Sequence, residues 1–92
     1  MITSRAGVEQ RRPYVSVLHR AGRTGYTVAF PDVPGCTATG RTVDQAMRNA
    51  REALDRHLAE LAAAGKPVPA PRDFHAVIMS TDSKGAIAFI LV

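Results

Sequence analysis

The sequence contains one cysteine, Cys36, no tryptophan and few other aromatic residues. A single thiol can form neither an internal disulfide nor a metal site built from several cysteines. So little cysteine is typical of a protein in a reducing compartment. With 92 residues, the chain has room for one domain, because a chain of this size buries only about 60–65% of its extended surface. We therefore expect one small domain that is stabilised by packing rather than by covalent cross-links.

Long hydrophobic runs are also missing, although 46% of the residues are hydrophobic. No stretch approaches the roughly 18 uninterrupted apolar residues that a membrane-spanning helix needs. Residues 1–7 lack the apolar central run of a secretory signal. These two absences predict a cytoplasmic protein that does not interact with a membrane.

Acidic residues are in the minority. The chain has eight Asp and Glu and twelve Lys and Arg, which gives a formal net charge of +4. This excess makes a basic nucleic-acid-binding module one function to consider. However, the basic residues are scattered along the sequence, and aromatic residues make up only 5% of it. A surface that binds nucleic acid is typically a basic patch interleaved with aromatic side chains. The scatter favours ordinary solvated surface charge.

Three short strands are predicted in the first half of the chain. Residues 1–12 are polar and aperiodic, so we treat them as a flexible N-terminal arm before a domain at residues 13–92. β-branched and alternating residues predict strands at 14–19 and 25–30, joined by a turn that contains glycine. Residues 36–40 can add a third strand, which would complete an antiparallel meander.

A long amphipathic helix is predicted next, at residues 43–64. Thr42 and Gln45 match a capping box, in which two side chains satisfy free backbone N–H groups at the start of a helix. Apolar residues then recur at spacings of three and four, which predicts a stripe that packs against a sheet. Gly65 supplies the left-handed position that ends many helices, and Pro67 prevents the helix from continuing.

The last third of the chain combines prolines with two apolar segments. Proline at every second position of residues 67–71 predicts an extended strap without hydrogen-bonded structure. Residues 74–79 and 86–92 are predicted strands around a turn. The predicted fold is therefore an α+β single domain of order β-β-β-α-β with a final β. Residues 90–92 end the sequence on apolar side chains without a polar cap. Either a buried central strand or an oligomer interface over an exposed sheet edge would explain them, and we favour the interface.

Residues that could carry catalysis are isolated from one another in the sequence. His19, His57 and His75 have no carboxylate or thiol at a familiar metal-ligand spacing. Cys36 is more readily explained as a small buried residue at the start of a strand than as a nucleophile. Asp32 follows a strand and precedes a proline turn, where an Asp side chain commonly bonds its own backbone. We expect no metal site, no cofactor and no enzymatic activity.

The loop at residues 30–36 (Phe-Pro-Asp-Val-Pro-Gly-Cys), the helix cap at 42–46 and the proline strap at 67–71 follow one another in a specific order and spacing. In this arrangement, over about residues 13–80, the chain resembles the HicB-like antitoxin family. The resemblance implies a partial, degraded ribonuclease-H-like fold without the acidic active site. It also implies that the protein neutralises a HicA-type toxin, a small RNA-cleaving protein, as the antitoxin of a type II toxin–antitoxin pair.

For this function we predict a homodimer or tetramer that binds the toxin through a sheet edge and the loop at residues 30–36. The residues predicted to contact the partner are Tyr26, Phe30, Asp32, Pro34 and Gly35. The alternative from a different class is a small metal-dependent nuclease that retains ribonuclease-H-like chemistry. Against it, the aspartates are spread over a loop, a helix start, a helix face and a linker, whereas two-metal catalysis needs carboxylates converging on ions about 4 Å apart.

The sequence departs from the family pattern in two ways. Many family members carry a C-terminal DNA-binding segment, whereas this sequence stops at Val92, so we do not expect it to bind DNA directly. An antitoxin that covers a basic, RNA-binding toxin is also expected to be acidic, because opposite potentials steer association. This chain is basic.

Overall fold

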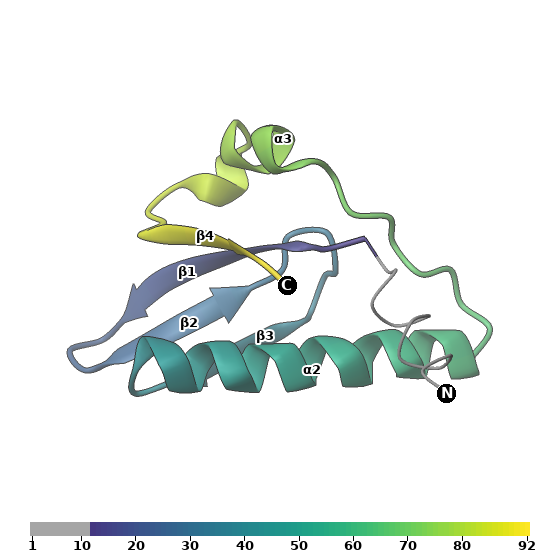
Figure 1. Ribbon diagram of the computed structural model, residues 1–92, viewed down its shortest axis with the longest axis horizontal. Helices are drawn as coiled ribbons and strands as arrows, with labels where there is room; N and C mark the ends of the chain where they lie inside the picture. Colours follow the sequence, from purple (N-terminus) through teal and green to yellow (C-terminus); the bar gives the residue numbers. More distant parts are fainter. Residues whose placement is uncertain (1–11) are drawn as a thin grey trace, which may run out of the picture.

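The computed structural model describes residues 12–92, which form one antiparallel sheet, one long helix and a short helical segment (Figure 1). The elements are β1 (Val15–Ala21), β2 (Gly25–Ala29), β3 (Thr37–Gly40), α2 (Val43–Ala63), α3 (Phe74–Ile78), a 3₁₀ turn (Thr81–Ser83) and β4 (Ala88–Leu91). The predicted α+β class, the meander and the final strand are confirmed. The predicted flexible arm at residues 1–12 lies, except for Arg12, outside the described residues.

The four strands are arranged in the order β3-β2-β1-β4, and each neighbouring pair is antiparallel. β4 returns from the far end of the chain to pair with β1, so that β3 and β4 are the two edge strands. Tyr14 and Val92 exchange both backbone hydrogen bonds, at 2.9 Å each. Because such pairs alternate along an antiparallel ladder, the N–H and C=O groups of Phe89 and Leu91 point away from β1, toward the free edge.

The prediction of a strand at residues 74–79 is wrong, because Phe74–Ile78 form the helix α3. Asp73 caps this helix, since its Oδ1 accepts a hydrogen bond from the Ala76 N–H at 3.1 Å. Phe74, Val77 and Ile78 share one helical face at spacings of three and four. Val77 is fully buried in a cluster with β1, so the helical conformation places this residue in the core.

The predicted long helix is confirmed, and α2 ends one residue earlier than expected. Thr42 Oγ1 accepts a hydrogen bond from the Gln45 N–H at 3.0 Å, as in a capping box. Gln45 Oε1 in turn accepts from the N–H of Arg41, at 2.8 Å, one residue before the usual donor. At the other end, Gly65 adopts a φ of 70° and Lys66 N–H bonds the Leu61 carbonyl, which is a Schellman motif.

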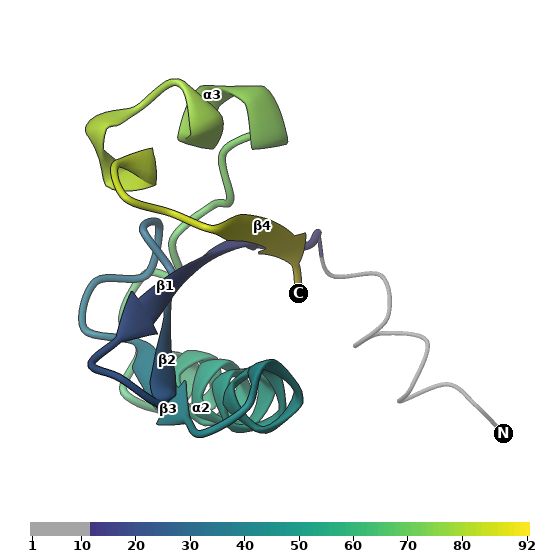
Figure 2. The ribbon, with the colours of Figure 1, turned by 90° about the vertical axis from the view of Figure 1, so that its left-hand side faces the viewer.

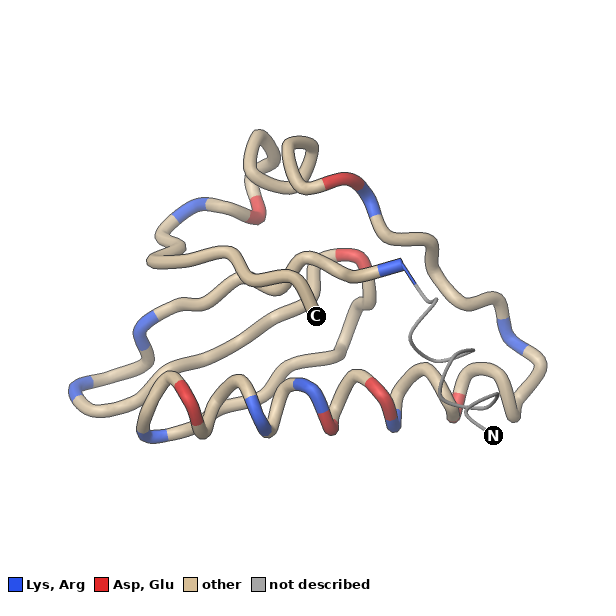
Figure 3. The backbone as a smooth tube through the Cα atoms, in the orientation of Figure 1, with Lys and Arg blue, Asp and Glu red and all other residues tan. Residues whose placement is uncertain are grey.

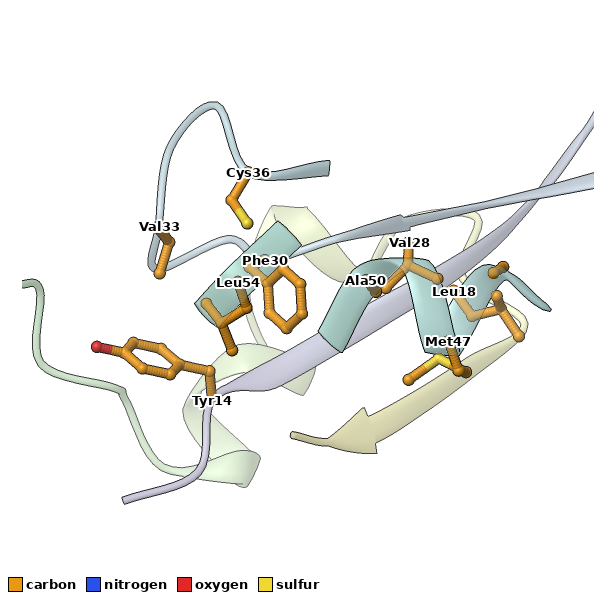
Figure 4. Close-up of a cluster of buried hydrophobic side chains, with 10 residues drawn as sticks. Tyr14, Leu18, Val28, Phe30, Val33, Cys36, Met47, Ala50 and Leu54 are labelled. Carbon is orange, nitrogen blue, oxygen red and sulfur yellow. The ribbon is translucent and has the colours of Figure 1, made fainter. Parts of the chain in front are cut away.

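The sheet has a core on each face (Figure 2). The larger core lies between the sheet and α2, and the close-up in Figure 4 shows Leu18, Val28 and Phe30 converging on Ala50 and Leu54. The smaller core lies on the opposite face, where Val77 and Phe89 join the β1 residues Val15 and Val17. This assignment follows from the alternation of side chains along a strand, since successive residues of β1 point to opposite faces.

Gly40, the last residue of β3, allows the sheet to approach α2 closely. A Cβ atom at this position would lie 2.4 Å from the backbone nitrogen of Ala46 and 2.7 Å from its Cα. Both atoms belong to helix backbone, so neither can rotate away. The glycine therefore fixes how closely β3 lies against the first turn of α2.

We predict that Gly40→Ala lowers the free energy of unfolding by about 1–3 kcal/mol, the usual cost of overpacking, because α2 must shift away from the sheet. The measurement is urea unfolding followed by circular dichroism. Gly22→Asn is the matched control, since a Cβ atom at Gly22 would meet no atom within 4 Å beyond its chain neighbours, and asparagine tolerates the φ of 62°. An equal loss in both variants would contradict the role given to the contact with α2.

Candidate functional site

The loop from Phe30 to Cys36, named here the signature loop, consists of two consecutive tight turns. The Val33 N–H bonds the Phe30 carbonyl at 2.9 Å, and the Cys36 N–H bonds the Val33 carbonyl at 3.0 Å. The second turn has proline and then Gly35 at its two central positions, with a Gly35 φ of 86°, which is the pattern of a type II turn. The Phe30 N–H closes the loop by bonding the Cys36 carbonyl at 3.2 Å.

Three side chains of the signature loop point inward and anchor it on the core. Phe30, Val33 and Cys36 are buried and lie close to Leu54 of α2 (Figure 4). Burial raises the pKa of the Cys36 thiol, and Arg56 offsets this rise in part. The thiol is therefore a buried, protonated residue of the core, as the sequence predicted, and not an activated nucleophile.

Asp32, the one acidic residue of the signature loop, binds Arg72, which lies forty residues further along the chain. Asp32 Oδ1 accepts a hydrogen bond from Arg72 Nε at 2.5 Å, and Oδ2 accepts from the Arg72 backbone N–H at 2.7 Å. The Asp32 side chain is 8% exposed, so water supplies little alternative solvation for its charge. The hydrogen bond from the Arg72 side chain to Asp32 raises the pKa of Arg72. The sequence predicted a bond from Asp32 to its own backbone, and the contacts in the structure are instead to Arg72.

Arg72 and its neighbours fasten the proline strap across the end of the sheet. The Arg72 guanidinium also contacts Asp82 Oδ2 at 3.4 Å, which adds the 3₁₀ turn to the same group of contacts. Upstream, the Tyr14 hydroxyl donates a hydrogen bond to the Pro69 carbonyl. The segment predicted to be an extended strap is therefore tied to the signature loop and to β1. Reasoning from sequence missed Arg72, because no local pattern joins a residue after a proline run to Asp32.

The structure divides the predicted contact residues between the two ends of β2. Pro34 and Gly35 form the exposed tip of the signature loop, while Phe30 and Asp32 lie beneath them and hold the loop in place. Tyr26 lies at the opposite end of β2, directly across from Arg20 of β1 and Gly40 of β3. The five residues therefore do not form one contiguous site.

Three aspartates of the domain have separate partners. Asp44 pairs with Arg48 at 3.1 Å on the surface of α2, Asp73 caps α3, and Asp32 binds Arg72. Within residues 12–92, no three His, Cys, Asp or Glu side chains are grouped so that they could hold a metal ion. In the same range, no helix combines the length and the apolar character that a membrane span requires.

Both the fold and the signature loop agree with what the comparison with protein families shows. The model of the HicB-like antitoxin of bacterial toxin–antitoxin systems matches residues 14–92. The chain belongs to this family. The resemblance seen in the signature loop, the helix cap and the proline strap is thereby confirmed, and it extends through β4.

Solved antitoxin structures have the same fold. The N-terminal domain of the Burkholderia pseudomallei antitoxin HicB is 28% identical, with a TM-score of 0.76 over 87% of this chain and 94% of that domain. Against the longer B. pseudomallei HicB structure the TM-score is 0.75, and the match covers 61% of that chain. A chain of the HicA3 and HicB3 toxin–antitoxin complex is 31% identical, with a TM-score of 0.69 over 84% of this chain and 93% of the other.

A phage protein shares a shorter segment with this chain. The uncharacterized 14.9 kDa protein in the rep-hol intergenic region of Haemophilus phage HP1 is 53% identical over 34 residues. The matched segment is 37% of this chain and 26% of the phage protein. The chain thus spans about a quarter of that relative and 61% of the longer HicB structure.

We predict that Arg72→Ala releases the proline strap. The variant leaves the Asp32 carboxylate nearly buried without its guanidinium partner, and Arg72 itself is 39% exposed, so that solvent reduces the effect. We expect the free energy of unfolding to fall by about 1–2 kcal/mol, which is below the upper range for hydrogen bonds to charged groups. Hydrogen exchange should accelerate most at the non-proline amides of residues 66–73. Arg51→Ala, on the exposed surface of α2, is the control, and equal acceleration in both variants would contradict the prediction.

Proposed function

We propose that this protein neutralises a HicA-type toxin in the cytoplasm by binding it, without catalysing a reaction. The observation that carries this proposal is the similarity to a chain of the HicA3 and HicB3 complex, which covers 84% of this chain at 31% identity. Membership of the antitoxin family supports it independently. Neutralisation by binding requires a surface rather than a catalytic group, and this fits the engaged carboxylates of the described residues.

The tip of the signature loop is the surface that we assign to the toxin. Pro34 and Gly35 are exposed there, while the two turns and the buried Val33 hold them in one conformation. A rigid loop loses little conformational entropy on binding, which favours affinity. Phe30 and Asp32 serve the contact indirectly, because the first anchors the loop in the core and the second ties it to Arg72.

The test is co-expression with a HicA-type toxin encoded beside this gene, followed by growth measurement and affinity co-purification. The unmodified chain should restore growth and co-purify with the toxin. Pro34→Arg should weaken binding at least tenfold, because it places a positive charge in the centre of the contact with a basic partner. Pro67→Arg, at an exposed proline of the strap, is the matched control and should bind normally. Continued growth arrest together with no co-purification of the unmodified chain would contradict the antitoxin role.

The homodimer or tetramer forms through the free edge of β4. Phe89 and Leu91 present unpaired N–H and C=O groups at this edge, and an exposed strand edge readily pairs with another strand. Leu91 is 52% exposed and borders a hollow of about 280 Å³ together with Phe74 and Pro71. A second copy in antiparallel pairing would satisfy the backbone groups and cover these apolar side chains.

We predict that Leu91→Pro converts the oligomer to a monomer in sedimentation velocity experiments. Proline removes the outward-facing N–H of Leu91 and leaves the hydrogen bonds between β4 and β1 in place. Thr39→Pro removes an outward-facing N–H from the opposite edge, on β3, and should leave the oligomer intact. A monomeric unmodified protein, or loss of the oligomer only with Thr39→Pro, would show that β4 is not the interface.

A further inference from the structure

The structure brings together three arginines that are far apart in the sequence. Arg20 lies near the end of β1, Arg23 in the turn that follows, and Arg41 directly before α2. Figure 1 shows that the β1–β2 turn and the start of α2 lie at the same end of the molecule, and Figure 3 shows basic residues gathered there. We name this group of Arg20, Arg23 and Arg41 the basic end. All three side chains are exposed.

An aromatic ring and a hollow lie within the basic end. Arg20 and Tyr26 are direct partners in the β1–β2 ladder, and the Arg20 guanidinium carbon lies 5.7 Å from the centre of the Tyr26 ring. On its other side, Tyr26 pairs with Gly40 at the end of β3, close to the first turn of α2. A hollow of about 430 Å³ opens there, lined in part by Tyr26, Arg41 and Asn49.

The positive charge of the basic end is not neutralised within the described part of the chain. Arg48 pairs with Asp44, and Arg72 pairs with Asp32 and Asp82. In contrast, no carboxylate in residues 12–92 forms an ion pair with Arg20, Arg23 or Arg41. The residues that line the hollow include no Asp or Glu. Arg41 lines the hollow, and Arg20 lies over the ring of Tyr26 at its border, so this end of the molecule offers positive charge to an anion.

We propose that the basic end binds single-stranded nucleic acid, with phosphates on the three arginines and an unpaired base in the hollow beside Tyr26. Guanidinium groups bind phosphate oxygens through paired N–H donors, and both an aromatic ring and a guanidinium plane can stack on an unpaired base. The surface is separate from the tip of the signature loop, since the two lie at opposite ends of β2. This activity therefore does not depend on the proposed toxin contact.

The geometry favours a single strand over two other anionic partners. In a duplex the bases are paired and stacked, so that none can enter a recess without being extruded. The carboxylates of an acidic protein segment would satisfy the arginines but offer no flat ring to stack on Tyr26, whereas every nucleotide supplies both a phosphate and a ring. Sequence-tolerant stacking combined with basic side chains is the usual arrangement of proteins that bind single strands.

The experiment measures binding of the purified full chain, without toxin, to fluorescein-labelled 12-nucleotide oligo(U) and oligo(dT) by fluorescence anisotropy. Substitution of Arg20, Arg23 and Arg41 by Gln together should weaken binding at least tenfold. It should also make the slope of log K against log salt shallower by about 2, since each phosphate contact on a single strand contributes about 0.7. Tyr26→Leu should weaken binding about fivefold or more with little change in slope, because stacking is lost and charge is kept.

A matched variant tests whether binding depends on the three arginines of the basic end or only on the net charge of the chain. Replacing Arg51, Arg56 and Lys66 by Gln removes the same charge from exposed positions elsewhere and should leave the affinity within about twofold. Equal weakening by both triple variants, or no effect of Tyr26→Leu, would overturn the proposal. Binding of a 12-nucleotide duplex or an oligoglutamate peptide as tightly as the single strand would overturn it as well. Thermal unfolding of each variant confirms that it remains folded.

Discussion

The hydrogen-bonded pair of Asp32 and Arg72 is the contact on which the second half of the structure depends. It joins the signature loop, which the core already holds in place, to a strap whose prolines cannot form regular hydrogen bonds. Directly after Arg72 comes Asp73, the cap of α3, and α3 places Val77 on the second face of the sheet. A nearly buried carboxylate is costly unless it is paired and hydrogen-bonded, and both of its oxygens are satisfied by one residue. This charged contact and the burial of Val77 together set the position of α3 and of the chain leading to β4.

Local signals in the sequence were sufficient for the first half of the fold and insufficient for the second. The boundaries of α2 could be predicted because Thr42, Gln45 and Gly65 act within one turn of the helix that they begin or end. The helix α3 was missed because five residues are too few for a periodic pattern, although the Asp73 cap and the spacing of Phe74 and Val77 did indicate it. The residues of the signature loop could be identified from the sequence, but the contact of Asp32 with Arg72 spans forty residues and has no local signature.

The position of β2 explains why the predicted contact residues separate into two groups. One end of this strand leads into the signature loop, whose inward side chains pack on α2 and whose tip remains exposed. The other end begins at the β1–β2 turn, where Tyr26 lies between an arginine and a glycine. A five-residue strand at about 3.3 Å per residue keeps these two surfaces roughly 15 Å apart. Two partners could therefore be bound without competing for the same residues.

The separation of the two surfaces also explains how a chain with a net positive charge could bind a basic toxin, although an acidic antitoxin would be expected. Arg20, Arg23 and Arg41 place three positive charges at one end of the molecule. They lie at the far end of β2 from the signature loop, beyond the Debye length of about 8 Å at physiological ionic strength. Around the loop, Asp32 and Asp82 surround Arg72, so that this cation is neutralised where a toxin would approach. The net charge of the chain is thus a poor guide to the potential at the loop, and a basic antitoxin does not have to repel a basic partner.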